Sequence, residues 1–141
     1  MANAMPQAIG AALGTGRQSI ALCGDGGFTM LMGELLTAAE LDLPVKLMIF
    51  NNSTRGMVRA EMEVAGYVPW GTDVKNPNFG ALAQAVGIHG ERVETCLLYT
   101  SIKHVPIEKP RQSGRIKNSG LTNDGASAVC IHLELLSLIH I

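Results

Sequence analysis

The stretch from Gly24 to Asn52 constrains the fold of this 141-residue chain more than any other part of the sequence. It begins with Gly-Asp-Gly-Gly after an apolar run at 19–23, and it ends with Asn51-Asn52 after a second apolar run at 45–50. Residues 33–41 between them have the length of one helix. Short apolar runs bounded by turn signals are typical of strands buried on both faces of a parallel sheet. The stretch therefore predicts strand, glycine turn, helix and strand.

Both predicted strands should end at the same edge of the sheet. A helix between two parallel strands makes a right-handed crossover, which brings the carboxyl ends of the strands together. Neighbouring strands lie about 5 Å apart. Asp25 and Asn52 are distant in sequence, yet they should emerge side by side at the edge where open α/β sheets bind ligands.

The side chains at this edge suit a hard metal ion and a phosphate group. One carboxylate and one amide oxygen favour Mg²⁺ or Ca²⁺ over zinc, and two protein ligands with open positions are the Mg²⁺ pattern. Gly26 and Gly27 lack a Cβ atom, so a diphosphate could approach their backbone N–H groups. The two segments together predict a metal–diphosphate site; the alternative is an Asp-Gly turn and a polar loop that bind nothing.

Two other phosphate-binding motifs are excluded by the residues present. A dinucleotide fingerprint requires a third glycine three residues after Gly26, where this chain has Thr29. A P-loop requires Gly-Lys-Ser or Gly-Lys-Thr, and neither triplet follows Gly24 or Gly27.

A Gly-Asp-Gly turn, a helix-length spacer and an Asn-Asn pair resemble the thiamin diphosphate motif of the pyruvate oxidase and decarboxylase superfamily. The similarity extends over residues 1–10, 24–32, 43–46 and 76–94, which look like the ubiquinone-dependent pyruvate dehydrogenase branch. It covers about residues 1–94. The resemblance implies a three-layer, doubly wound parallel α/β sheet, here truncated, that forms part of the thiamin pyrophosphate-binding domain.

The resemblance also implies a ligand set. Asp25 and Asn52 would bind Mg²⁺ through their side chains, and Thr54 through its backbone carbonyl. The cofactor-binding residues would be these three together with Gly24, Gly26, Gly27, Gly56 and Met57. No catalytic residue is expected in this part of the enzyme, because the glutamate that activates the cofactor comes from another domain in this family.

By the same resemblance the whole enzyme would decarboxylate pyruvate oxidatively to acetate and CO₂, passing electrons through FAD to a quinone. The FAD site would lie outside this chain, the fragment alone would be inactive, and the enzyme would be a homo-oligomer, either a dimer or a tetramer.

Two positions depart from that branch or are shared with another. Arg55 stands where the branch usually has an apolar residue, and Met57-Val58 also occurs in acetolactate synthase-like proteins. Acetolactate synthase or another 2-oxo acid decarboxylase is therefore the alternative, and a non-catalytic α/β interaction domain is the alternative of another class.

Composition narrows the class of protein further. The net charge of −1 gives no electrostatic basis for nucleic-acid binding. No apolar run approaches the roughly 20 residues of a membrane span, and the N-terminus lacks the pattern of a signal peptide. The three cysteines form no Cys-x-x-Cys pair, which favours reduced thiols in the cytoplasm, with Cys23 in the core. Any peripheral membrane contact would come from segments outside this chain.

Periodicity predicts further helices over 2–13, 53–65 and 79–86, and a strand around 92–93. Asn78 is the expected N-cap of the last helix and Gly87 its C′ residue. Met57 and Val58 would line a substrate pocket or simply pack in the core. Tyr67 and Trp70 would contact a quinone or partner subunit, or pack against their own loop.

The character of the sequence changes at Thr95. Residues 96–101 and 135–141 resemble translated sequencing-adapter sequence, and 105–128 are polar with scattered Pro and Gly, which is typical of poor order. We therefore expect two parts: a partial thiamin diphosphate-binding domain at 1–94, and at 95–141 a non-family tail that is artefactual or disordered. The alternative is a genuine divergent tail that binds a partner.

Overall fold

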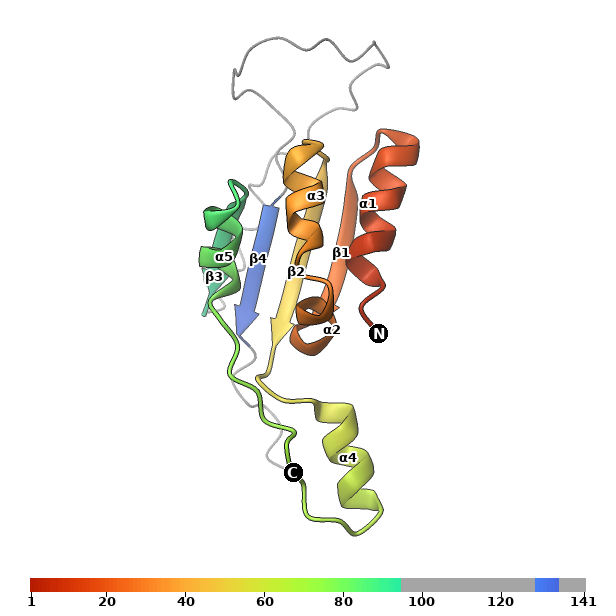
Figure 1. The fold of residues 1–141 in the computed structure, drawn as a ribbon, viewed down its shortest axis with the longest axis vertical. Coiled ribbons are helices and arrows are strands. Elements are labelled where there is room, and N and C mark those ends of the chain that lie inside the picture. Colours follow the sequence, from red (N-terminus) through yellow and green to blue (C-terminus); the bar gives the residue numbers. More distant parts are fainter. Residues whose placement is uncertain (95–128, 135–141) are drawn as a thin grey trace.

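The computed structural model describes residues 1–94 and 129–134, which form a parallel α/β sheet with helices on one face (Figure 1). The first half of the domain consists of α1 (Ala4–Thr15), β1 (Ser19–Gly24), α2 (Asp25–Met30), α3 (Glu34–Glu40) and β2 (Val45–Asn51). The second half consists of α4 (Gly56–Val64), α5 (Phe79–Ala85), β3 (His89–Val93) and β4 (Val129–Glu134). All strand pairs are parallel and the strand order is β1-β2-β4-β3. The predicted parallel α/β fold is confirmed.

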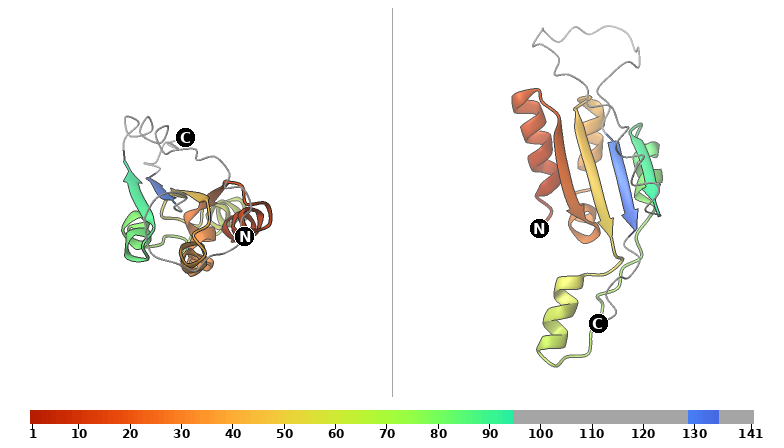
Figure 2. Two further views of the ribbon diagram at one scale, coloured as in Figure 1. Left: turned by 90° about the horizontal axis from the view of Figure 1, so that it is seen from above. Right: turned by 180° about the vertical axis from the view of Figure 1, so that it is seen from behind.

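The core lies between the sheet and the helices α1, α3 and α5, which Figure 2 shows on the same side of the strands. In β2 the alternate residues Val45, Leu47 and Ile49 point into this core and are at most 1% exposed. They meet Met5 and Leu35 from the helices, and Phe28 packs edge-to-face on Phe79 with ring centroids 5.2 Å apart. Alternation within strands and periodicity within helices thus produce one continuous apolar layer.

The opposite face of β1 is not buried within the described residues, contrary to the expectation for this strand. Ile20 and Leu22 are each 60% exposed, whereas Ala21 and Cys23 on the helix side are buried. The reason is that the described helices cover one face of the sheet, so these residues form two layers. Cys23 itself lies in the core as predicted, with 6% exposure.

Several local predictions were close and two were wrong. Asn78 caps α5 by accepting a hydrogen bond from the Ala81 N–H at 3.2 Å, and Gly87 follows the helix with φ +82°. The glycines after β1 were predicted to form a turn, but they lie in a short helix, α2. Helical periodicity in residues 33–41 predicts that Leu36 faces the sheet together with Leu35 and Ala38, but Leu36 is 59% exposed and only the other two are buried.

Strand β4 comes from the segment that sequence analysis assigned to a tail. Its backbone lies between β2 and β3 and pairs with both, with Lys46 opposite Val129 and His89 opposite the same residue. Residues 129–134 therefore join β3 to the rest of the sheet. The predicted boundary after residue 94 and the predicted nature of the tail stay predictions, and residues 95–128 and 135–141 lie outside the described part.

The α4 arm, defined here as residues 56–70, projects beyond the carboxyl ends of the strands (Figure 1). No residue of α4 is buried, and the arm carries large exposed apolar side chains: Met57, Val58, Val64, Tyr67, Val68 and Trp70. Trp70 is 86% exposed and Tyr67 is 68% exposed, so neither ring packs against its own loop. The arm thus presents an apolar surface that no described residue covers.

Helix α5 approaches β3 unusually closely, which generates a first prediction. A Cβ on Gly90 would collide with the Gly80 carbonyl oxygen and come within 2.8 Å of the Ala83 Cβ. Overpacking of this kind costs about 1–3 kcal/mol, so Gly90→Ala should lower the free energy of unfolding by about 2 kcal/mol in urea titrations. Gly10→Ala is the control: its Cβ would meet nothing within 4 Å, and alanine within α1 should raise stability. Equal stability of the two variants would contradict this view of the α5–β3 contact.

Candidate functional site

The carboxyl ends of β1 and β2 bring a buried carboxylate and a buried amide together. Gly24 pairs with Phe50, so the next residues, Asp25 and Asn51, both follow from this last pair at the same edge of the sheet. Asp25 begins α2 and is 4% exposed, while Asn51 ends β2 and is 6% exposed. The edge of the sheet where sequence analysis placed the site therefore holds polar side chains that are shielded from water.

A third polar side chain, Asn76, joins these two from the loop that precedes α5. Its Nδ2 donates to Asp25 Oδ2 at 2.5 Å and to Asn51 Oδ1 at 2.7 Å. We call this set of Asp25, Asn51 and Asn76 the polar clasp. A buried carboxylate requires such partners, because an unpaired charge away from water is costly.

Asn52 and Thr54, the other two predicted metal ligands, lie just beyond the clasp. The Asn52 side chain is exposed, and its Oδ1 accepts a hydrogen bond from the Thr54 N–H at 3.2 Å. Asn51 Oδ1, by contrast, already accepts from Asn76, from the Ser53 N–H at 3.1 Å and from the Ser53 hydroxyl at 3.4 Å. Of the two neighbouring asparagines, Asn52 is therefore the one whose amide oxygen has capacity for a further partner.

The segment that carries Thr54 is held by a short antiparallel pairing. Thr54 bridges Asp73, and the flanking hydrogen bonds run from the Arg55 N–H to Thr72 O at 2.8 Å and from the Val74 N–H to Ser53 O at 3.0 Å. These bonds use the backbone of the neighbours of Thr54, so its own carbonyl takes no part in them. This pairing fixes the position of the segment that follows Asn52.

The predicted glycines leave space at the ends of the strands. A Cβ on Gly24 or Gly26 would meet nothing within 4 Å, while one on Gly27 would lie 3.5 Å from the Ala2 nitrogen. Gly56 would place a Cβ 3.5 Å from Asn52 Nδ2, an ordinary contact. Met57, at the start of α4, is 77% exposed. The backbone near Gly24 and Gly26 is thus open to a ligand within the described residues.

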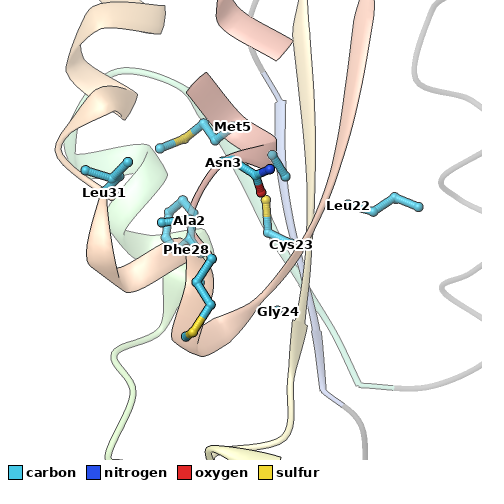
Figure 3. Close-up of a pocket in the computed structure, with 11 residues that line it drawn as sticks. Ala2, Asn3, Met5, Leu22, Cys23, Gly24, Phe28 and Leu31 are labelled. Atoms are coloured by element: carbon cyan, nitrogen blue, oxygen red, sulfur yellow. The ribbon is translucent and has the colours of Figure 1, made fainter. Parts of the chain in front are cut away.

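A cavity of about 200 Å³ adjoins this edge, and sequence analysis did not predict it (Figure 3). It is lined by the N-terminal residues 1–5, by Leu22, Cys23 and Gly24 at the end of β1, and by Gly27, Phe28 and Leu31 of α2 and its C-cap. The N-terminal segment lies beside α2, since residues of both line the same cavity. The cavity therefore reaches Gly27, one of the two glycines of the predicted diphosphate position, and Gly24 at the end of β1.

The structure brings together residues that the sequence could place only in part. The sequence did not predict Asn76 or the role of Asn51 in the polar clasp. One signal was present: Asn76 precedes Pro77, and the residue before a proline favours an extended conformation.

Within residues 1–94 and 129–134 no group of three or more His, Cys, Asp or Glu side chains is arranged around a common point. No helix in that part of the chain is long and apolar enough to cross a membrane.

Comparison with known proteins identifies the family. Residues 1–105 match the family described as "Thiamine pyrophosphate enzyme, C-terminal TPP binding domain". The chain belongs to this family, whose cofactor, thiamin pyrophosphate, is also called thiamin diphosphate. The match continues past residue 94, the boundary expected from sequence analysis.

Individual relatives agree with this placement. A putative thiamine pyrophosphate-containing protein, YdaP, of Bacillus subtilis is 40% identical over 94 residues, which are 66% of this chain and 16% of the relative. The mitochondrial acetolactate synthase of Schizosaccharomyces pombe is 38% identical over 96 residues, which are 67% of this chain and 14% of that enzyme. The chain thus spans about one sixth of the length of these relatives or less.

A solved structure shows the same fold. The thiamine diphosphate-dependent 4-hydroxybenzoylformate decarboxylase of Rhodococcus jostii RHA1 superposes with a TM-score of 0.71 at 26% identity, over 95% of this chain and 23% of the decarboxylase. The parallel α/β sheet and the polar site at the strand ends therefore agree with membership of a family of thiamin diphosphate-dependent enzymes.

The burial of Cys23 generates a second prediction. Burial raises the pKa of its thiol, and a hydrogen bond with the Met5 backbone only partly offsets this effect. In the folded chain Cys23 should therefore react with iodoacetamide much more slowly at mildly alkaline pH than in the urea-unfolded chain. Mass spectrometry of the tryptic peptide 18–46, in which Cys23 is the only cysteine, would measure the rate. Equal rates in the two states would contradict the buried position.

Proposed function

We propose that this chain is the part of a thiamin diphosphate-dependent enzyme that binds the diphosphate and Mg²⁺, and that the whole enzyme acts on a 2-oxo acid. The observation that carries the proposal is the buried Asp25 carboxylate at the ends of two parallel strands, beside glycines whose Cβ positions are open. Membership of this family supports thiamin diphosphate as the cofactor. The oxygen donors of Asp25, Asn52 and Thr54 support Mg²⁺, because a hard cation prefers such ligands.

In this proposal the residues of the chain bind and orient the cofactor, and the cofactor supplies the chemistry of decarboxylation through its thiazolium ring. Asp25 and Asn52 would hold the cation by their side-chain oxygens and Thr54 by its carbonyl. The N–H groups around Gly26 and Gly27 would face the diphosphate, and the adjoining cavity would be available to the rest of the cofactor. Met57 and Val58, exposed on α4, remain candidates for the substrate side of the site.

There are two candidates for the reaction of the whole enzyme. Similarity to the ubiquinone-dependent pyruvate dehydrogenase branch supports oxidative decarboxylation of pyruvate, with FAD and a quinone bound outside this chain. Relatives named acetolactate synthase, and one named a probable 2-ketoarginine decarboxylase, support non-oxidative 2-oxo acid chemistry about equally. A homo-oligomer is part of either proposal, and the exposed apolar side chains of the α4 arm support it.

The metal site gives a third prediction. Asp25→Ala should abolish Mg²⁺-dependent binding of thiamin diphosphate to the 141-residue chain, because the only charged ligand of the proposed site is lost. Isothermal titration with the cofactor, with and without Mg²⁺, measures this. Glu40→Ala, which removes an exposed carboxylate at the far end of α3, is the control and should bind as the unaltered chain does. Unchanged binding by Asp25→Ala would refute the assignment.

The reaction gives a fourth prediction, made for the whole enzyme that contains this chain. With pyruvate and a soluble quinone, an oxidase-type enzyme should release acetate and reduce the quinone in equal amounts. An acetolactate synthase would instead consume two molecules of pyruvate for each CO₂ and leave the quinone oxidised. Measuring acetate, reduced quinone and CO₂ in one assay distinguishes the two candidates, and turnover of neither kind would exclude both reactions of pyruvate.

A further inference from the structure

We propose that Asn76 is a positioning residue for the Mg²⁺ site, holding the Asp25 carboxylate in the orientation in which it binds the cation. This inference rests on the proposed Mg²⁺ and diphosphate site. Asn76 is not one of the expected ligands, and it lies far from Asp25 in sequence. It is nonetheless the hydrogen-bond partner of the Asp25 side chain among the described residues, at 2.5 Å.

The hydrogen-bond pattern dictates which way the amide groups of the polar clasp point. The Ser53 N–H can only donate, so the Asn51 atom that faces it at 3.1 Å must be the amide oxygen. Asn76 faces that same oxygen at 2.7 Å and a carboxylate oxygen on its other side. Both neighbours are acceptors, so the atom between them must be the amide nitrogen, with one N–H for each. Asn76 is therefore orientated without ambiguity.

This arrangement fixes Asp25 by one of its two oxygens. The bond to Asn76 uses Oδ2, which sets the rotation of the carboxylate and directs Oδ1 to the opposite side. Without Asn76, the Asp25 carboxylate and the Asn51 carbonyl oxygen would face each other with no donor between them. Both residues are at least 94% buried, so water could not readily replace the missing donor.

Asn76 is itself held from both sides along the chain. On one side, the Val74 N–H donates to Ser53 O at 3.0 Å, which ties its loop to the segment of Asn52 and Thr54. On the other side, Pro77 follows directly, and the clash of its ring with the preceding residue disfavours a helical conformation at Asn76. The loop that positions Asp25 and the loop that carries the other expected ligands are therefore one connected unit.

The test is the Mg²⁺ requirement of cofactor binding by Asn76→Ala in the full 141-residue chain. Loss of a residue that orients a metal ligand typically costs about 10- to 100-fold in metal affinity. At a fixed thiamin diphosphate concentration, the Mg²⁺ concentration for half-maximal binding should rise by about that factor. Asn76→Ser, which keeps one hydroxyl donor, should show a smaller rise and serves if the alanine variant does not fold.

A matched control separates positioning from general stability. Asn78→Ala, two residues away, removes the exposed N-cap of α5 and should lower the unfolding midpoint while leaving the Mg²⁺ requirement unchanged. A Mg²⁺ requirement within twofold of the unaltered chain in a folded Asn76 variant would overturn this inference alone. Absence of Mg²⁺-dependent binding by the unaltered chain would overturn the proposed function, and the role of Asn76 with it.

Discussion

The parallel pairing of β1 with β2 is the constraint on which the candidate site depends. The register sets Gly24 beside Phe50, and the residues that follow this pair are Asp25 and Asn51. A slip of one residue would turn Val45, Leu47 and Ile49 away from the helices, because successive side chains of a strand point to opposite faces. The burial of these three residues therefore fixes the register, and the register fixes the distance between the carboxylate and the amide. Core packing and site geometry have the same physical cause.

A second constraint is the return of the chain after the α4 arm. The pairing of residues 53–55 with 72–74 closes the arm at its base, so that the chain comes back to the edge of the sheet that it left. Asn76 then reaches Asp25 and Asn51, and Asn78 begins α5 directly afterwards. The polar clasp is thus made by three separate segments, and the arm can present its apolar side chains outward without disturbing it.

The exposed apolar surfaces agree with the small share of its relatives that this chain spans. Parallel sheets are usually covered on both faces, yet Ile20 and Leu22 are largely exposed in the described residues. Trp70 and Met57 on the α4 arm are more exposed still. The matched segments are 14–16% of the length of the first two relatives named above. In the proposed function these surfaces face other parts of the enzyme.

The sequence by itself determined the features that depend on short-range pattern. The strands predicted at 19–23 and 45–50, the N-cap Asn78, the core position of Cys23 and the meeting of the two strand ends at one edge all followed from periodicity and local conformational preference. It could not determine that Asn76 would meet Asp25, because 51 positions separate them and neither residue's neighbours encode the contact. Nor could it show that Leu36 and the apolar residues of α4 would be exposed, since periodicity marks an apolar side and not what covers it. Only the tertiary structure decided these points, because they depend on how distant segments share one sheet edge.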